Sequence, residues 1–185
     1  EMKTTLFICA SILLLAFECA KEENNPMLSQ EVLFVKLYEN HAWAMQYEGW
    51  FIDNSGYVRG FSIDRDPELE WLDLSEGGFI SEKRVLNNYH LTDTTLVNLP
   101  LSEVVKHYQL IKNAARGILS EAVPNGADMG QLSYYGLLLD TENQQYRFIL
   151  LESYGDQIVN NTSGESQKIA SWMKGVDNQI SLLAE

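Results

Sequence analysis

The side chains able to perform acid–base, nucleophilic or metal chemistry are scattered along this sequence rather than gathered in motifs. Its three histidines are His41, His90 and His107. None of them stands in an HExxH-type spacing, which would place two imidazoles on one face of a helix as a metal-binding pair. No serine lies in a nucleophile elbow. The sequence therefore predicts no catalytic residue, no metal site and no cofactor.

One segment has the spacing of part of a calcium-binding EF-hand loop. Asp73, Ser75 and Ser81 would supply oxygen ligands, and Gly78 stands where such a loop turns sharply. The twelfth position, which should be a bidentate glutamate, is Arg84, and its positive charge opposes a cation. The sequence instead favours a glycine turn that leads into a helix capped by Ser81.

Glu48 is the carboxylate with the most unusual setting, since it falls inside a predicted strand between Tyr47 and Trp50. If its strand face were covered, desolvation would raise its pKa and the group could act as an acid. The commoner alternative is a glutamate that faces solvent, because Glu is seldom buried.

Aromatic residues supply a second candidate for function. Trp50 is predicted to share a strand face with Glu48, an unusual place for an indole unless a helix covers it or a partner binds it. Gly49 beside it would let another group approach closely. We therefore predict a binding surface for a glycan or a protein at Trp50, Glu48 and Trp71, with ordinary core packing as the alternative.

These side chains must be positioned by an α+β domain. Hydrophobic alternation and turn residues predict a mainly antiparallel sheet of two hairpins plus an N-terminal strand, with about three helices packed on it. An irregular loop is expected over residues 64–78. The predicted strands are 32–38, 42–53, 57–63, 132–140 and 145–154, and the predicted helices are 81–89, 101–119 and one that begins at 162.

Composition narrows the function classes. The 185 residues carry a net charge of −13, so nucleic acid and anionic membrane surfaces would repel this chain. The length suits one domain with a self-sufficient core.

The first residues predict export. An apolar run over residues 6–17 follows Lys3 and is too short for a transmembrane helix, but it fits the core of a signal peptide. Cys19 follows this run and is succeeded by Ala20-Lys21-Glu22-Glu23. The segment resembles the signals of surface-exported lipoproteins of the Bacteroidota. The resemblance implies a signal peptide over 1–18 and a lipidated tether over 19–30 that begins at Cys19. The remaining length, 31–185, suits a single domain.

A lipid on Cys19 would make the membrane itself a partner, since buried acyl chains supply the affinity. The expected location is the outer membrane or cell surface, and a periplasm-facing position stays open. The predicted function is a non-catalytic binding domain. Two alternatives remain, namely a cell-envelope hydrolase with a dispersed active site and an acidic inhibitor or immunity-type protein that meets a basic partner.

Overall fold

The computed structural model describes residues 28–42, 45–74 and 77–183. The predicted signal segment, Cys19 and most of the tether lie outside the described residues. The predicted fold class is confirmed, because the domain is an α+β fold built on a nine-stranded, mainly antiparallel sheet.

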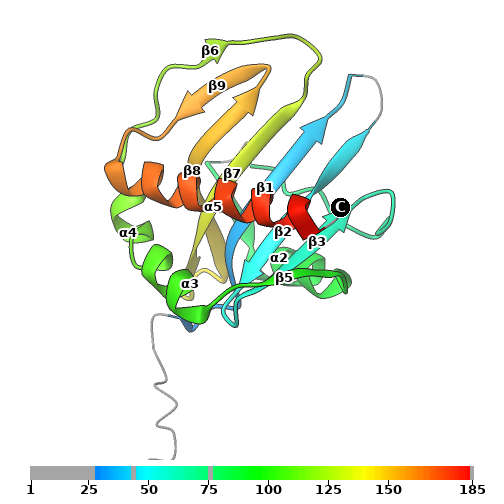
Figure 1. Ribbon diagram of the computed structural model, residues 1–185, viewed down its shortest axis with the longest axis vertical. Helices are drawn as coiled ribbons and strands as arrows, with labels where there is room; N and C mark the ends of the chain where they lie inside the picture. The colour runs from blue at the N-terminus through cyan, green and yellow to red at the C-terminus, as the bar shows by residue number, and fades with distance from the viewer. Residues whose placement is uncertain (1–27, 43–44, 75–76, 184–185) are drawn as a thin grey trace, which may run out of the picture.

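The sheet has the strand order β5-β3-β2-β1-β7-β8-β9-β6, and β4 pairs with β8 beside this path (Figure 1). Both predicted hairpins are present, as β2–β3 and β7–β8, and the predicted N-terminal strand β1 joins them at the centre of the sheet. The strands are β1 (Val32–Asn40), β2 (Gln46–Asp53), β3 (Tyr57–Ser62), β4 (Phe79–Ser81), β5 (Thr95–Asn98), β6 (Val123–Pro124), β7 (Gln131–Asp140), β8 (Gln145–Gly155) and β9 (Gln157–Asn160).

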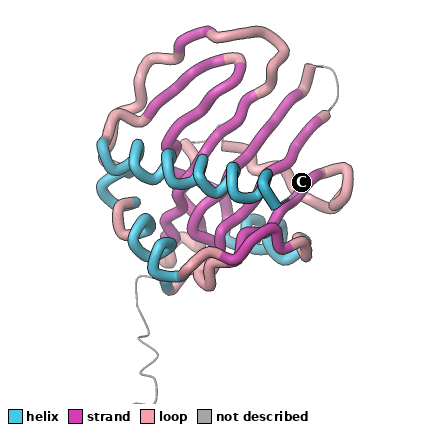
Figure 2. Tube along the Cα trace, viewed as in Figure 1, coloured by secondary structure: helices cyan, strands magenta, loops and turns pink. Residues whose placement is uncertain are grey.

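Helices cover both faces of the sheet, so the domain has two cores. The long helix α5 (Gly164–Leu183) crosses the sheet on one face, together with α3 (Leu101–Tyr108) and α4 (Ile111–Ala114) (Figures 1 and 2). Helix α2 (Glu82–Leu91) and the chain that follows β3 pack on the other face. Covering on both sides explains why the first four residues of β1 are fully buried.

The predicted continuous helix over 101–119 is wrong, because the chain turns between α3 and α4. The amide of Leu110 bonds three residues back, to the carbonyl of His107 at 3.1 Å, and this tighter turn redirects the chain. Ile111 then packs against β7 at Gly136, where a Cβ would lie 1.8 Å from the Ile111 side chain. The side-chain Nδ2 of Asn161 donates to the carbonyl of Ala114, the last residue of α4, at 3.0 Å and so satisfies a carbonyl at the helix end.

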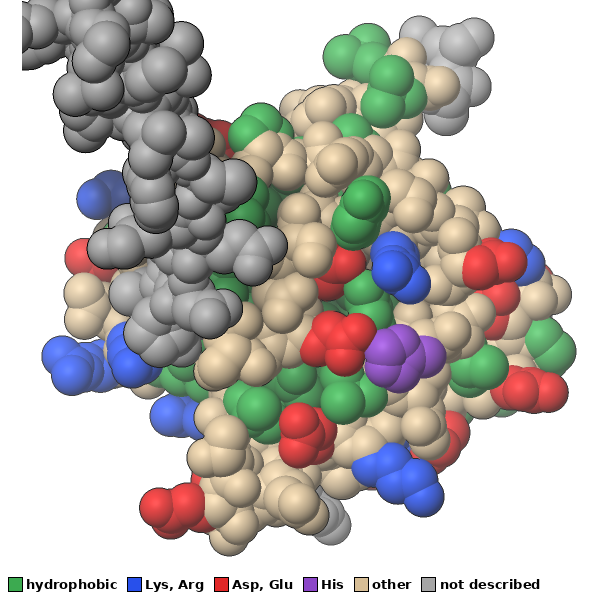
Figure 3. Space-filling view, turned by 90° about the horizontal axis from the view of Figure 1, so that it is seen from below, with side chains coloured by type: hydrophobic (Ala, Val, Ile, Leu, Met, Phe, Trp, Pro, Cys, Tyr) green, Lys and Arg blue, Asp and Glu red, His purple; other side chains and the backbone are tan. Residues whose placement is uncertain are grey.

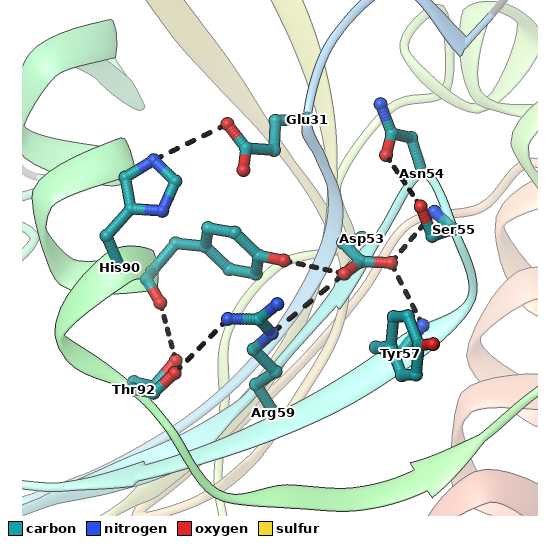
Figure 4. A network of polar contacts seen from close by, with 9 residues as sticks. Glu31, Asp53, Asn54, Ser55, Tyr57, Arg59, His90 and Thr92 are labelled. Carbon is teal, nitrogen blue, oxygen red and sulfur yellow. Dashed lines mark hydrogen bonds and ion pairs between the residues drawn. The ribbon is translucent and has the colours of Figure 1, made fainter.

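The turn between β2 and β3 joins the sheet to α2 through a buried carboxylate (Figure 4). Asp53 is 3% exposed and accepts hydrogen bonds from the backbone amides of Ser55 and Tyr57, at 2.8 and 2.9 Å. Its second oxygen accepts a 2.6 Å bond from the hydroxyl of Tyr89, on α2. Gly56, at φ +90°, completes the turn. These contacts make the network a structural anchor between two elements.

Candidate functional site

A cavity of about 440 Å³ opens on the face of the sheet that carries α2, and we call it the Trp71 pocket. It combines carboxylates, an imidazole and aromatic rings that come from separate parts of the chain. The end of β1, the segment after β3 and the strand β7 all contribute to it. Its lining residues are Glu39, His41, Trp71, Leu72, Asp73, Leu74 and Tyr135.

Strand alternation brings Glu39 to the pocket. In β1, Val35 and Leu37 point into the core beneath α2, and the period of two places Glu39 on that same face at the strand end. Tyr135 belongs to the neighbouring strand β7, where it pairs with Val35. The sheet therefore supplies a carboxylate and a phenol on one wall.

The irregular segment that carries Trp71 is held at two points. The amide of Leu72 donates to the hydroxyl of Tyr47 at 3.2 Å. The side chain of Asn88, on α2, accepts from the amide of Glu70 at 3.0 Å and donates to the carbonyl of the same residue at 2.7 Å. Trp71 stands between these fixed residues, so its indole is positioned by the sheet and by α2.

The indole of Trp71 contacts two other rings. The buried ring of Tyr47 lies at a centroid distance of 4.2 Å and an interplanar angle of 51°. The exposed imidazole of His41 lies at 4.9 Å and 29°, a stacked arrangement. The indole itself is half-buried. An aromatic surface is therefore available at the mouth of the pocket, with an imidazole seated on it.

The electrostatics of the pocket are those of a poorly solvated acid. Burial raises the pKa of Glu39 above its ordinary value; the charge of His41 opposes this rise and the charge of Asp73 adds to it. Burial also raises the pKa of Tyr135, with a smaller contribution from Glu39. A carboxylate with a perturbed pKa in a cleft is a recognised sign of a functional site.

The structure does not bring the three predicted binding residues together. Glu48 is exposed on β2, on the face of the sheet opposite the Trp71 pocket. Trp50 lies on the same face as Glu48 but is only 3% exposed, because α5 covers it. Its indole Nε1 donates to Asp177 of α5 at 2.8 Å. The prediction that Trp50 presents an exposed recognition surface is therefore wrong, and the helix-covered alternative holds.

Glu48 and the edge of Trp50 do line a second groove, of about 520 Å³, near the end of α5. Its walls are mainly apolar and include Leu132 and Ile180. The close approach predicted at Gly49 is made by the protein itself: a Cβ there would lie 1.9 Å from the carbonyl oxygen of Lys36.

The other two histidines, His90 and His107, lie outside the Trp71 pocket. His107 is buried and stacks on Trp172, with a centroid distance of 4.3 Å and an angle of 5°, and its Nδ1 donates to the carbonyl of Glu103 at 2.7 Å. Burial lowers the pKa of His107. His90 lies 3.5 Å from the carboxylate of Glu31. His107 therefore serves packing, whereas His41 lines a cavity.

The segment with EF-hand spacing builds the predicted turn and cap in its described part. Gly77 and Gly78 have φ values of +72° and +77°, and the hydroxyl of Ser81 accepts from the amide of Arg84 at 3.4 Å. The guanidinium of Arg84 pairs with Glu70 at 3.1 Å. Across the described ranges, no group of three or more His, Cys, Asp or Glu side chains is arranged to hold a metal ion.

The underside of the domain is the end at which the β2–β3 turn lies (Figure 1). In Figure 3 the coloured part of this face mixes acidic, basic and hydrophobic side chains. A further cavity has no Trp, Tyr or Phe among its described lining residues, which are Glu68, Glu70, Asn87, His90 and Leu91.

Comparison with known proteins adds no identity, because no family model, curated protein or solved structure matches this chain. Among the helices of the described residues, none is both long and apolar enough to cross a membrane.

Proposed function

We propose that this chain is an exported cell-envelope protein, held at the outer membrane or cell surface by a lipid on Cys19, whose folded domain binds a ligand in the Trp71 pocket. The proposed location rests on the N-terminal signal and on the cysteine that follows it. The binding role rests on the pocket.

The observation that carries the binding role is the setting of Glu39. Burial raises the pKa of this carboxyl, so its ionised form is disfavoured in the folded domain. A desolvated charge opposes folding at neutral pH. The carboxylate of Glu39 lines an open cavity together with the half-buried indole of Trp71. A ligand that completes the surroundings of Glu39 and packs on the ring would relieve that cost.

A binding screen with matched variants tests the proposal. The delipidated mature protein would be titrated against immobilised envelope glycans and against acidic, neutral and basic peptides. Trp71→Ala and Glu39→Gln are expected to abolish saturable binding. Tyr154→Ala and Glu121→Gln change an exposed ring and an exposed carboxylate elsewhere and are expected to leave it intact. Binding that survives Trp71→Ala would show that the pocket is not the site.

The hydrolase alternative is favoured by one feature of the same pocket. Glu39, with its raised pKa, has Asp73 and His41 in electrostatic contact, which suits a general acid. In that case Glu39→Gln would retain binding and lose turnover of chromogenic glycosides or esters. No turnover by the wild type would leave the binding role as the better proposal.

A further inference from the structure

We infer that the group that enters the Trp71 pocket is a planar cation, the guanidinium of an arginine side chain on a basic polypeptide partner. This inference rests on the proposed function and names the ligand class of the same site. Of the functions predicted from the sequence, this inference favours the acidic inhibitor or immunity-type protein that meets a basic partner.

The charge of the pocket is complementary to a cation. Its lining holds the carboxylates of Glu39 and Asp73, and no lysine or arginine stands among its described lining residues. The whole chain has 26 acidic and 13 basic residues, so its field attracts a basic partner over a longer range.

The rings favour a flat cation over a compact one. A cation within about 6 Å of an aromatic face is attracted by the ring quadrupole, most strongly by tryptophan. Arginine stacks on such faces and is more weakly hydrated than lysine, so it loses less on entering a half-buried site. Its fork of N–H donors also matches the geometry of a carboxylate such as Glu39.

His41 shows which chemistry the site accepts. Its imidazole is flat, is cationic when protonated, stacks on Trp71 and lowers the pKa of Glu39 through its charge. Unlike His107, which is buried against Trp172, the His41 side chain is exposed to solvent. We therefore read His41 as the protein's own occupant of the position that a guanidinium would take.

Peptide titration with the delipidated mature protein tests this inference. The probes are a hexapeptide of alternating glycine and arginine, its lysine counterpart and its citrulline counterpart, which keeps the shape and removes the charge. At about 150 mM salt, where long-range attraction is screened, the arginine peptide is expected to bind about tenfold tighter than the lysine peptide. The citrulline peptide is expected not to bind.

The variants separate this site from general attraction to an acidic protein. Trp71→Leu and Glu39→Gln are expected to weaken arginine-peptide binding by at least about tenfold, and Glu121→Gln to leave it unchanged. His41→Ala is expected to strengthen it, because the competing imidazole is gone. Trp71→Phe keeps a ring and should give an intermediate affinity, which preserves the test if Trp71→Leu unfolds.

Two results would overturn the inference: equal binding of the citrulline peptide, or a loss in His41→Ala as large as that in Trp71→Leu. If the arginine peptide fails while another ligand binds in a Trp71-dependent manner, the cation assignment is wrong and the proposed function stands. If no ligand depends on Trp71, both are wrong.

Discussion

Replacing Trp50 by alanine is expected to destabilise the domain strongly while leaving the Trp71 pocket intact. The indole is 3% exposed between the sheet and α5. Trp50, Lys36 and Tyr134 lie side by side on β2, β1 and β7, and all three side chains bond to Asp177 of α5. Removing the indole therefore leaves a cavity and removes one donor from the carboxylate that holds the helix.

The magnitude follows from these two losses. Truncation of a buried Phe or Trp to Ala costs about 3–5 kcal/mol. The groove beside Trp50 admits water to part of the space, so we expect about 3–4 kcal/mol. A hydrogen bond to a charged group contributes about 1.5–3 kcal/mol, and Asp177 keeps Lys36 at 2.8 Å, so Trp50→Phe should cost about 1.5 kcal/mol.

Urea denaturation of the wild type, Trp50→Ala, Trp50→Phe and Trp71→Ala measures these values as changes in the free energy of unfolding. Trp71→Ala serves as the comparison, because its indole is only half-buried and lies on the other face. A loss below about 1 kcal/mol in Trp50→Ala would refute the reasoning and return Trp50 to the class of recognition residues. Equal losses in Trp50→Ala and Trp50→Phe would show that the hydrogen bond, not packing, dominates.

Four further perturbations test other parts of the structure. Tyr89→Phe removes the donor to buried Asp53 and is expected to cost about 1.5–3 kcal/mol in urea denaturation, with no effect on peptide binding. Burial lowers the pKa of His107, so the free energy of unfolding is expected to fall as the pH drops below 6.5, the ordinary pKa of histidine. The change in this free energy between about pH 7.5 and 5.5 should be smaller in His107→Gln than in the wild type. The pKa of Glu39 is raised above 4.5, so its ionisation opposes folding as the pH rises, and Glu39→Gln is expected to raise the melting temperature at about pH 7.5. Cys19→Ala is expected to release the protein from the membrane fraction, whereas an unlipidated wild-type N-terminus in mass spectrometry would contradict the lipoprotein prediction.

Elements specified by local chemistry were predictable from the sequence. Alternating hydrophobic residues mark β1, and the Asp53–Gly56 turn joins β2 to β3 through bonds within five residues. The short strand β4 was missed because it forms only where β8 offers a partner, at Phe79 opposite Arg147. The break after α3 was missed for a similar reason, since the contact of Ile111 at Gly136 joins residues that are distant in the sequence.

The candidate site was predicted only in part. Residue type alone points to Trp71. Its place beside His41 depends on hydrogen bonds that its two chain neighbours make to Tyr47 and Asn88, and no local pattern reveals these bonds. The sequence held one signal for this site: Glu39 follows Val35 and Leu37 at a spacing of two, so a carboxylate continues a strand face that is otherwise apolar. Trp50 was misplaced because its cover comes from Asp177, which is 127 residues away in the chain.

Two carboxylates on opposite faces of the sheet decide which cavity is the better site. Asp177 meets the ammonium of Lys36 and the donors of Trp50 and Tyr134, so its interactions are completed by the protein and serve to fix α5. Burial raises the pKa of Glu39, and it prevails over the charge of His41, which opposes that rise. The groove near Trp50 is larger, at about 520 Å³ against 440 Å³. Of its two charged lining residues, however, Lys36 is already paired with Asp177 and Glu48 is exposed to solvent. The Trp71 pocket holds a charge whose surroundings a ligand would complete, and for that reason the smaller cavity is the stronger candidate.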